Sequence, residues 1–162
     1  MSRTATFAAT LAALYAAHEV GDHWVQTHTQ ACTKGGRGDQ QRAGQLACAR
    51  HVATLTATKA AVLAITAVVT KTRLPLGRTL LALGLDATSH YAIDRRWTLA
   101  AFADRTGKAS FYQLGQPRPG RDDNPSLGTG AYALDQAAHT ACLWVAALII
   151  ASGQELLPDG TT

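Results

Sequence analysis

Four long apolar stretches alternate with polar connections along the chain, and each stretch is long enough to form a helix. The predicted helices cover residues 4–29, 44–71, 76–94 and 131–154. A glycine-rich stretch, residues 35–41, separates the first two, and Pro75 with Gly77 interrupts the chain before the third. The pattern predicts an all-α fold in which residues 1–162 form a single four-helix domain.

The connection between the third and fourth helices is long and polar. It contains a short amphipathic stretch, residues 97–104, and a proline- and glycine-rich stretch, residues 113–125, that cannot form regular structure. Connections of this length in compact domains are commonly functional or disordered. The sequence leaves open whether residues 110–130 close over a site.

Polar side chains recur at four-residue steps inside these apolar helices. Asp86, His90 and Asp94 share one helical face at the end of the third helix. The other helices contain similar positions, namely His18, Asp22 and Gln26 in the first, His51 in the second, and Asp135 and His139 in the fourth. Such groups in apolar surroundings need water or polar partners beside them.

The low content of charged residues favours membrane-spanning helices. Charged residues make up 16% of the chain, against roughly 25% of an average soluble domain. Residues 60–69 and 137–153 are the most apolar stretches. Because alanine and threonine make the other two helices only weakly apolar, a soluble helical bundle remains the alternative.

Lysine and arginine are unequally distributed between the two sides of a four-span bundle. The connections after the first and third helices carry ten of them, whereas the N-terminus and the second connection carry four. The positive-inside rule therefore places the long connections in the cytoplasm and both termini outside. All four polar clusters then lie at the cytoplasmic ends of their helices, at one depth in the membrane.

The net charge and the cysteines narrow the choice of partners and compartment. The formal net charge is +4, but the basic residues are scattered through the connections, so we do not expect a nucleic-acid partner. Three cysteines, Cys32, Cys48 and Cys142, without paired spacing predict a reducing compartment and no disulfide framework. Arg3 is the only basic residue before the apolar residues 4–17, whereas a signal peptide begins with a more basic segment. We therefore predict a first helix that is retained in the mature protein.

Imidazoles and carboxylates from facing helices are typical ligands of zinc, manganese or iron, and we expect zinc first. The candidate ligands are His18, Asp22, His51, His90, Asp94, Asp135 and His139, of which Asp22, Asp94 and Asp135 are also candidate catalytic groups. Gln26 and Asp86 are candidates for orienting these ligands. A metal in such a site activates water against an ester or phosphoester of a small-molecule or lipid-like substrate at the membrane surface.

The same residues also have structural interpretations. His18 with Asp22 could be a helical ion pair, and Asp135 could interact with the dipole of its helix. Asp86 could instead pair with Lys59, which lies inside the second helix. Two further histidines, His23 and His28, lie off the polar stripe and are expected to be exposed.

Four motifs follow one another along the chain: H-E-V-G-D-H-W-V-Q (residues 18–26), His51, H-Y-A-I-D (residues 90–94) and D-Q-A-A-H (residues 135–139). In this order they resemble the small bacterial membrane proteins grouped as domain of unknown function family 3307. The resemblance covers nearly the whole chain, and the connection before the last helix is the least comparable part. The positions that match the family pattern are His18, Asp22, Gln26, His51, His90, Asp94, Asp135 and His139.

The chain is more distantly similar to inner-membrane metal-dependent hydrolases of the YdjM type. That similarity implies a His/Asp metal centre among helices of the bacterial inner membrane. Asp86 lies outside the family pattern, and Glu19 and His23 stand where the pattern has apolar or aromatic residues.

Three functions are compatible with these observations. The first is a multi-pass membrane hydrolase with a cytoplasm-facing metal site. The second is a membrane conduit for a divalent ion or a proton, because ionisable groups inside membranes also mark transport paths. The third is a soluble, basic, helical binding protein. Membrane lipid is the expected partner of the first two, and a homo-oligomer is left open.

Overall fold

The protein is helical throughout the part of the chain that the structure describes. This computed structural model describes residues 2–118, 120 and 128–154, and among them has seven α-helices and no strand. The elements are α1 (Arg3–Val20), the π-helical turn η1 (Gly21–Val25), α2 (His28–Thr33), the 3-10 turn η2 (Gly38–Gln40), α3 (Gln41–Thr70), α4 (Leu76–Asp94), α5 (Trp97–Arg105), α6 (Ala109–Tyr112) and α7 (Gly130–Ser152). The all-α class predicted from the sequence is confirmed.

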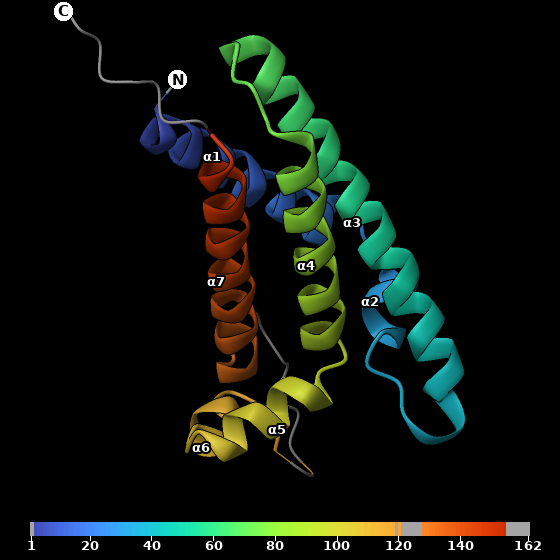
Figure 1. The fold of residues 1–162 in the computed structure, drawn as a ribbon. Helices are drawn as coiled ribbons and strands as arrows, with labels where there is room; N and C mark the ends of the chain where they lie inside the picture. Colours follow the sequence, from blue (N-terminus) through green and yellow to red (C-terminus); the bar gives the residue numbers. More distant parts are fainter. Residues whose placement is uncertain (1, 119, 121–127, 155–162) are drawn as a thin grey trace, which may run out of the picture.

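The four long helices form a bundle (Figure 1). Both α1 and α4 pack against α3 and α7, and apolar side chains such as Leu14, Leu63, Leu143 and Ile150 fill the space between them. The short helices α5 and α6 lie across the end of the bundle at which α4 ends and α7 begins (Figure 1). This end is the one that carries the polar clusters.

The first helix is shorter than predicted, so the single helix over residues 4–29 is wrong. α1 gives way at Gly21 to a wider turn, in which the N–H of Gln26 donates to the carbonyl of Gly21. The helix passes so close to α3 here that a Cβ on Gly21 would lie 2.2 Å from Cδ1 of Leu55. Turns of this π-helical type recur at functional sites, and this one carries Asp22.

A new helix, α2, begins immediately after this turn. The Thr27 hydroxyl accepts from the N–H of Gln30, and the Gln30 side chain accepts from the N–H of Thr27. These reciprocal bonds form a capping box, which stabilises a helix start. The T-x-x-Q spacing that marks this start is visible in the sequence.

Two of the long helices are long and apolar enough to cross a membrane, namely those within residues 38–70 and 130–152. Only 22% and 28% of their most apolar stretches are buried inside the bundle. Large apolar side chains accordingly cover its outside, among them Ile65, Val68, Val69, Leu76, Leu80 and Trp144.

The contact between α6 and the start of α7 generates a stability prediction. A Cβ on Gly130 would lie 1.7 Å from the carbonyl oxygen of Phe111, so Gly130→Ala forces the two backbones apart. We expect this substitution to lower the free energy of unfolding by about 1–3 kcal/mol. Thermal unfolding in detergent measures the effect.

Gly84→Ala is the matched control. A Cβ on Gly84 meets no atom within 4 Å, so the gain in helix propensity should leave stability unchanged or raise it by up to about 1 kcal/mol. Equal melting temperatures for the two variants would contradict the packing described for Gly130.

Candidate metal centre

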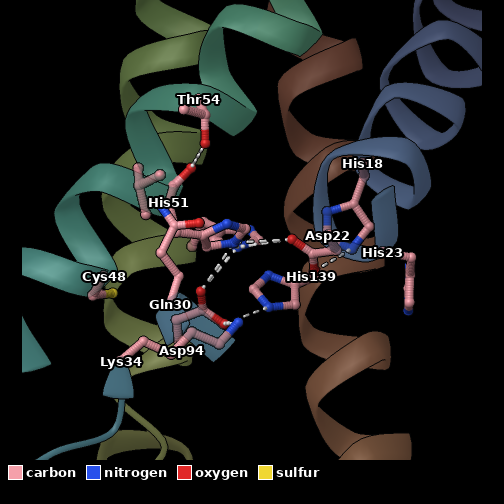
Figure 2. Close-up of polar contacts among 12 residues, drawn as sticks. His18, Asp22, His23, Gln30, Lys34, Cys48, His51, Thr54, Asp94 and His139 are labelled. Carbon is pink, nitrogen blue, oxygen red and sulfur yellow. Dashed lines mark hydrogen bonds and ion pairs between the residues drawn. The ribbon is translucent and has the colours of Figure 1, made fainter. Parts of the chain in front are cut away.

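The polar residues of four separate elements meet at one end of the bundle. η1 contributes Asp22, α3 contributes His51, α4 contributes His90 and Asp94, and α7 contributes His139. The imidazoles of His51, His90 and His139 and the Asp94 carboxylate are at most 2% exposed. Figure 2 shows the Asp22 and Asp94 carboxylates pointing towards the imidazoles of His51 and His139 between the helices.

Four side-chain atoms at the centre of this cluster lie at nearly equal separations. His51 Nε2 is 3.0 Å from Asp22 Oδ1, 3.3 Å from Asp94 Oδ2 and 3.1 Å from His90 Nε2. His90 Nε2 is in turn 3.5 Å from Asp22 Oδ1 and 3.2 Å from Asp94 Oδ2. Five of the six distances between these four atoms therefore measure 3.0–3.5 Å.

These separations are close to those between the ligand atoms of a tetrahedral metal site. Zinc binds imidazole nitrogen and carboxylate oxygen at about 2.0–2.2 Å, which gives a tetrahedron with edges of about 3.3–3.6 Å. Several of the central atoms are also buried without a hydrogen-bond partner, including Asp22 Oδ1 and Asp94 Oδ2. Buried polar atoms rarely remain unpaired. The residues present thus fit a divalent ion, in both the type of ligand atom and its spacing.

Three more candidate residues surround this central group. His18 Nε2 lies 3.6 Å from Asp22 Oδ2, and neither ring nitrogen of His18 has a hydrogen-bond partner. His139 Nε2 lies 3.8 Å from Asp94 Oδ1 and 3.6 Å from Asp135 Oδ2. Asp94, Asp135 and His139 therefore form a second group with the spacing of metal ligands, and His18, Asp22 and His90 form a third.

The charge state of Asp22 follows from its neighbours. Burial by itself would raise the pKa of this carboxyl. The His51 imidazole, 3.0 Å from Oδ1, and the nearby His90, His18 and Lys34 outweigh burial and hold the pKa of Asp22 below its usual range. Asp22 is therefore ionised, as a metal ligand must be.

Sequence reasoning missed Lys34, which reaches into the cluster from the end of α2. Its ammonium lies 2.8 Å from Asp94 Oδ1, and its side chain is only 12% exposed. In the sequence Lys34 is one basic residue of a connection that also contains Arg37 and Arg42. Nothing in its local pattern distinguishes it from those two.

Arg95 holds the backbone that carries Lys34. Its guanidinium donates to the carbonyl of Lys34 and to the carbonyl of Gly36, each at 2.6 Å, and the side chain is buried. Gly44 leaves room for this arrangement, since a Cβ there would lie 2.7 Å from Arg95 Nη1. The end of α4 thereby fixes the position of Lys34.

Asp86 does not face the central cluster. Its Oδ2 accepts a hydrogen bond from Lys59 Nζ at 2.6 Å, and both side chains are almost completely buried. Of the two interpretations left open by the sequence, the structure shows the ion pair with Lys59. No contact among the described residues supports the orienting role considered for Asp86.

The remaining candidates lie at the edge of the cluster or outside it. Gln26 lines the cavity beside the cluster, and its amide nitrogen is buried without a hydrogen-bond partner. His23 and His28 are exposed, as expected from their positions off the stripe. Cys48 Sγ lies 3.6 Å from the carbonyl of Tyr91, and Cys32 lies beside His28.

A cavity of about 860 Å³ opens beside the cluster. Asp22, Asp94 and Asp135 line it, together with residues from η1, α2, α5, α6 and the start of α7. A small molecule or the head group of a lipid fits this volume. The cavity therefore connects the candidate metal ligands to the outside.

Comparison with known protein families assigns the chain to one of them. The sequence profile of a family of proteins of unknown function, DUF3307, matches residues 10–158. The chain belongs to the DUF3307 family. The match includes every cluster residue from α1 to α7, so the family resemblance noted from the sequence is confirmed. No curated protein and no solved structure matches the chain.

The buried ion pair of this DUF3307 protein generates a second stability prediction. Lys59→Met leaves the Asp86 carboxylate buried without its partner, which we expect to cost about 3–5 kcal/mol of unfolding free energy. The double variant Lys59→Met/Asp86→Leu removes both charges and should recover most of that loss. Unfolding in detergent measures both, and a double variant as unstable as the single one would contradict the pairing.

Proposed function

We propose that this protein is a multi-pass protein of the bacterial inner membrane that binds a divalent metal ion at the cytoplasmic end of its helix bundle. We further propose that it hydrolyses an ester or phosphoester at the membrane surface. The observation that carries the proposal is the convergence of four ligand atoms, from His51, His90, Asp22 and Asp94, at separations of 3.0–3.5 Å. Zinc is the metal that this geometry favours, ahead of manganese or iron.

The exposed surface supports a membrane location. Only 22% and 28% of the most apolar stretches of these two helices are buried in the bundle, whereas the core helix of a soluble protein is mostly buried. α1 and α4 contain 18 and 19 residues, a length of about 27–29 Å that is close to the hydrocarbon thickness of a bilayer. Four spans with both termini outside agree with the excess of lysine and arginine in the long connections.

Aromatic residues at the cluster end of the bundle support the same orientation. Trp24, Trp97, Phe102 and Phe111 are all exposed there, on η1, α5 and α6. Exposed aromatic side chains are enriched where a membrane meets water. This distribution supports a position of the cavity at the membrane surface, where it could receive a soluble substrate or the head group of a lipid.

The residues of the cluster divide between holding a metal and moving a proton. A divalent ion held there would polarise the substrate and lower the pKa of a coordinated water. Asp135 lines the cavity with a side chain that is 26% exposed, whereas the side chains of Asp22 and Asp94 are 8% and 2% exposed. We assign to it the role of general base, which takes the proton of the attacking water and passes it to the departing alkoxide. His18 and His139 lie behind the ligands and orient their carboxylates.

Conduction of an ion or a proton is the second candidate function. The Lys59–Asp86 pair favours it, because these charged groups lie deeper in the bundle than the cluster. Leu63, Ala82 and Leu143, however, belong to an apolar core that continues beyond this pair. A conduit would need polar groups along the whole path, so hydrolysis agrees better with the described residues.

Metal analysis tests the centre directly. Purified in detergent and dialysed against zinc, the protein should retain about one ion per chain. The variant His90→Ala/Asp94→Ala should retain none, because it removes two of the four ligands. Elemental analysis gives the content, and zinc should raise the melting temperature of the wild type alone.

The matched control is His28→Ala/Asp39→Ala, which removes the same two residue types from exposed positions. It should bind zinc as the wild type does. The single substitution His51→Gln removes one ligand but keeps the site polar. It tests the centre even if the double variant fails to fold. Equal metal content in all four proteins would eliminate the proposed centre.

The assignment of Asp135 predicts a loss of rate without a loss of metal. Asp135→Asn should lower the hydrolysis of chromogenic esters or phosphoesters by roughly 10²–10⁴-fold, since it removes the proton acceptor. Asp104→Asn, on the exposed surface of α5, is the control. Unchanged turnover in Asp135→Asn with full metal content would refute the assignment.

A further inference from the structure

The cavity contains two cations beside the proposed metal ligands. Lys34 lines the cavity and contacts Asp94, and Arg96 lines it beside α5. Neither belongs to the acids and histidines that recur at four-residue steps. Both come from connections, Lys34 from the end of α2 and Arg96 from the residue before α5.

Arg96 is held in an uncommon backbone conformation. Its φ is +57° and its ψ is −49°, and the N–H of Trp97 donates to the carbonyl of Arg95 across it at 2.6 Å. This is the rare γ-turn with positive φ, which side-chain-bearing residues seldom adopt. Such outliers concentrate at functional sites.

Contacts with α2 and Gly35 also hold the Arg96 side chain in place. Its guanidinium donates to the carbonyl of Ala31 in α2 at 2.9 Å. The aliphatic part packs over Gly35, where a Cβ would lie 2.9 Å from Arg96 Cδ. The guanidinium carries more donors than this one bond uses. It can therefore also bind a group inside the cavity.

Lys34 lies beside the second group of ligand-like residues, Asp94, Asp135 and His139. Its ammonium already contacts the Asp94 oxygen that faces His139. In hydrolases with two metals, a second cation clamps the other oxygens of the reacting group. Lys34 supplies a positive charge at the corresponding place without a second metal.

The charge of the cavity depends on the metal. Three carboxylates, Asp22, Asp94 and Asp135, and two cations, Lys34 and Arg96, line it. These side chains sum to −1 without a metal, and one divalent ion reverses the sum to +1. Tyr112 and Tyr132 add hydroxyl groups to the lining. A loaded cavity therefore attracts an anion rich in hydrogen-bond acceptors.

We propose that Lys34 and Arg96 bind the phosphate group of a phosphate monoester substrate, next to the metal. This inference rests on the proposed function and specifies its substrate class. A monoester phosphate has enough oxygens to contact the metal, the ammonium and the guanidinium together. A neutral carboxylic ester offers no negative charge for the two cations to bind.

The test measures phosphate binding separately from metal binding. Zinc-loaded protein in detergent is titrated calorimetrically with inorganic phosphate and with phenyl phosphate. We expect Lys34→Met to weaken both by roughly 10- to 100-fold, the effect of losing a hydrogen bond between charged groups. Arg96→Gln should weaken them less, because Arg96 is more exposed. Zinc content should stay at the wild-type level in both variants.

Conservative and distant variants complete the design. Lys34→Arg keeps the charge beside Asp94 and should retain binding within a few-fold, even if Lys34→Met folds poorly. Lys108→Met and Arg105→Gln remove exposed cations that do not line the cavity and should bind as the wild type does. Unchanged phosphate affinity in Lys34→Met and Arg96→Gln with full zinc content overturns the phosphate site but not the metal centre.

If the wild type holds no zinc, the proposed function fails, and the phosphate site is then judged on the metal-free protein. Weaker phosphate binding by Lys34→Met than by the wild type still supports the phosphate site, and equal binding overturns it.

A second experiment uses phosphatidylcholine nanodiscs with and without phosphatidic acid. Competition by phosphatidic acid against phenyl phosphate indicates a lipid source, and binding of phenyl phosphate alone indicates a soluble one. Binding of neither overturns the proposal.

Discussion

Compensation of buried charge at one end of the bundle is the constraint on which the rest of the structure depends. Asp22, Asp94 and four imidazoles from four elements lie almost completely out of water. Burying a carboxylate costs free energy unless a cation or hydrogen-bond donors stabilise it. Lys34 provides one cation, yet Asp22 Oδ1 and Asp94 Oδ2 remain without hydrogen bonds. The metal proposed for the centre would complete the compensation, so that the fold and the proposed function would depend on the same atoms.

Three consecutive residues at the end of α4 connect this centre to the chain around it. Asp94 faces the imidazoles, Arg95 holds the backbone of Lys34, and Arg96 turns the chain into α5 while contacting α2. Beyond the last helical turn, successive side chains no longer follow the 3.6-residue period. They can therefore point in three directions from one place. Substitutions at these three residues would therefore affect the candidate metal ligands, the cavity and the α2 segment together.

The position of the site within the bundle agrees with chemistry at a membrane surface. Apolar side chains pack between the helices away from the cluster, whereas α5 and α6 lie across its open end (Figure 1). The deep Lys59–Asp86 pair is internally neutral and needs no solvent. The polar cluster and its cavity thus lie at one end of the bundle, where under the proposed function a substrate would arrive from water or from the lipid head groups.

The sequence by itself determined the helical class, the range of α4 and the gathering of acids and imidazoles at one end. It could do so because a four-residue step keeps side chains on one helical face, and because successive helices reverse direction. Only the tertiary structure decided which atoms meet. Asp86 belongs to the same stripe as His90 but turns to Lys59, and Lys34 enters from a connection with no pattern. Such choices depend on the distances between helices, on the π-helical turn that begins at Gly21 and on the turn at Arg96. Residue spacing within one helix does not encode these features.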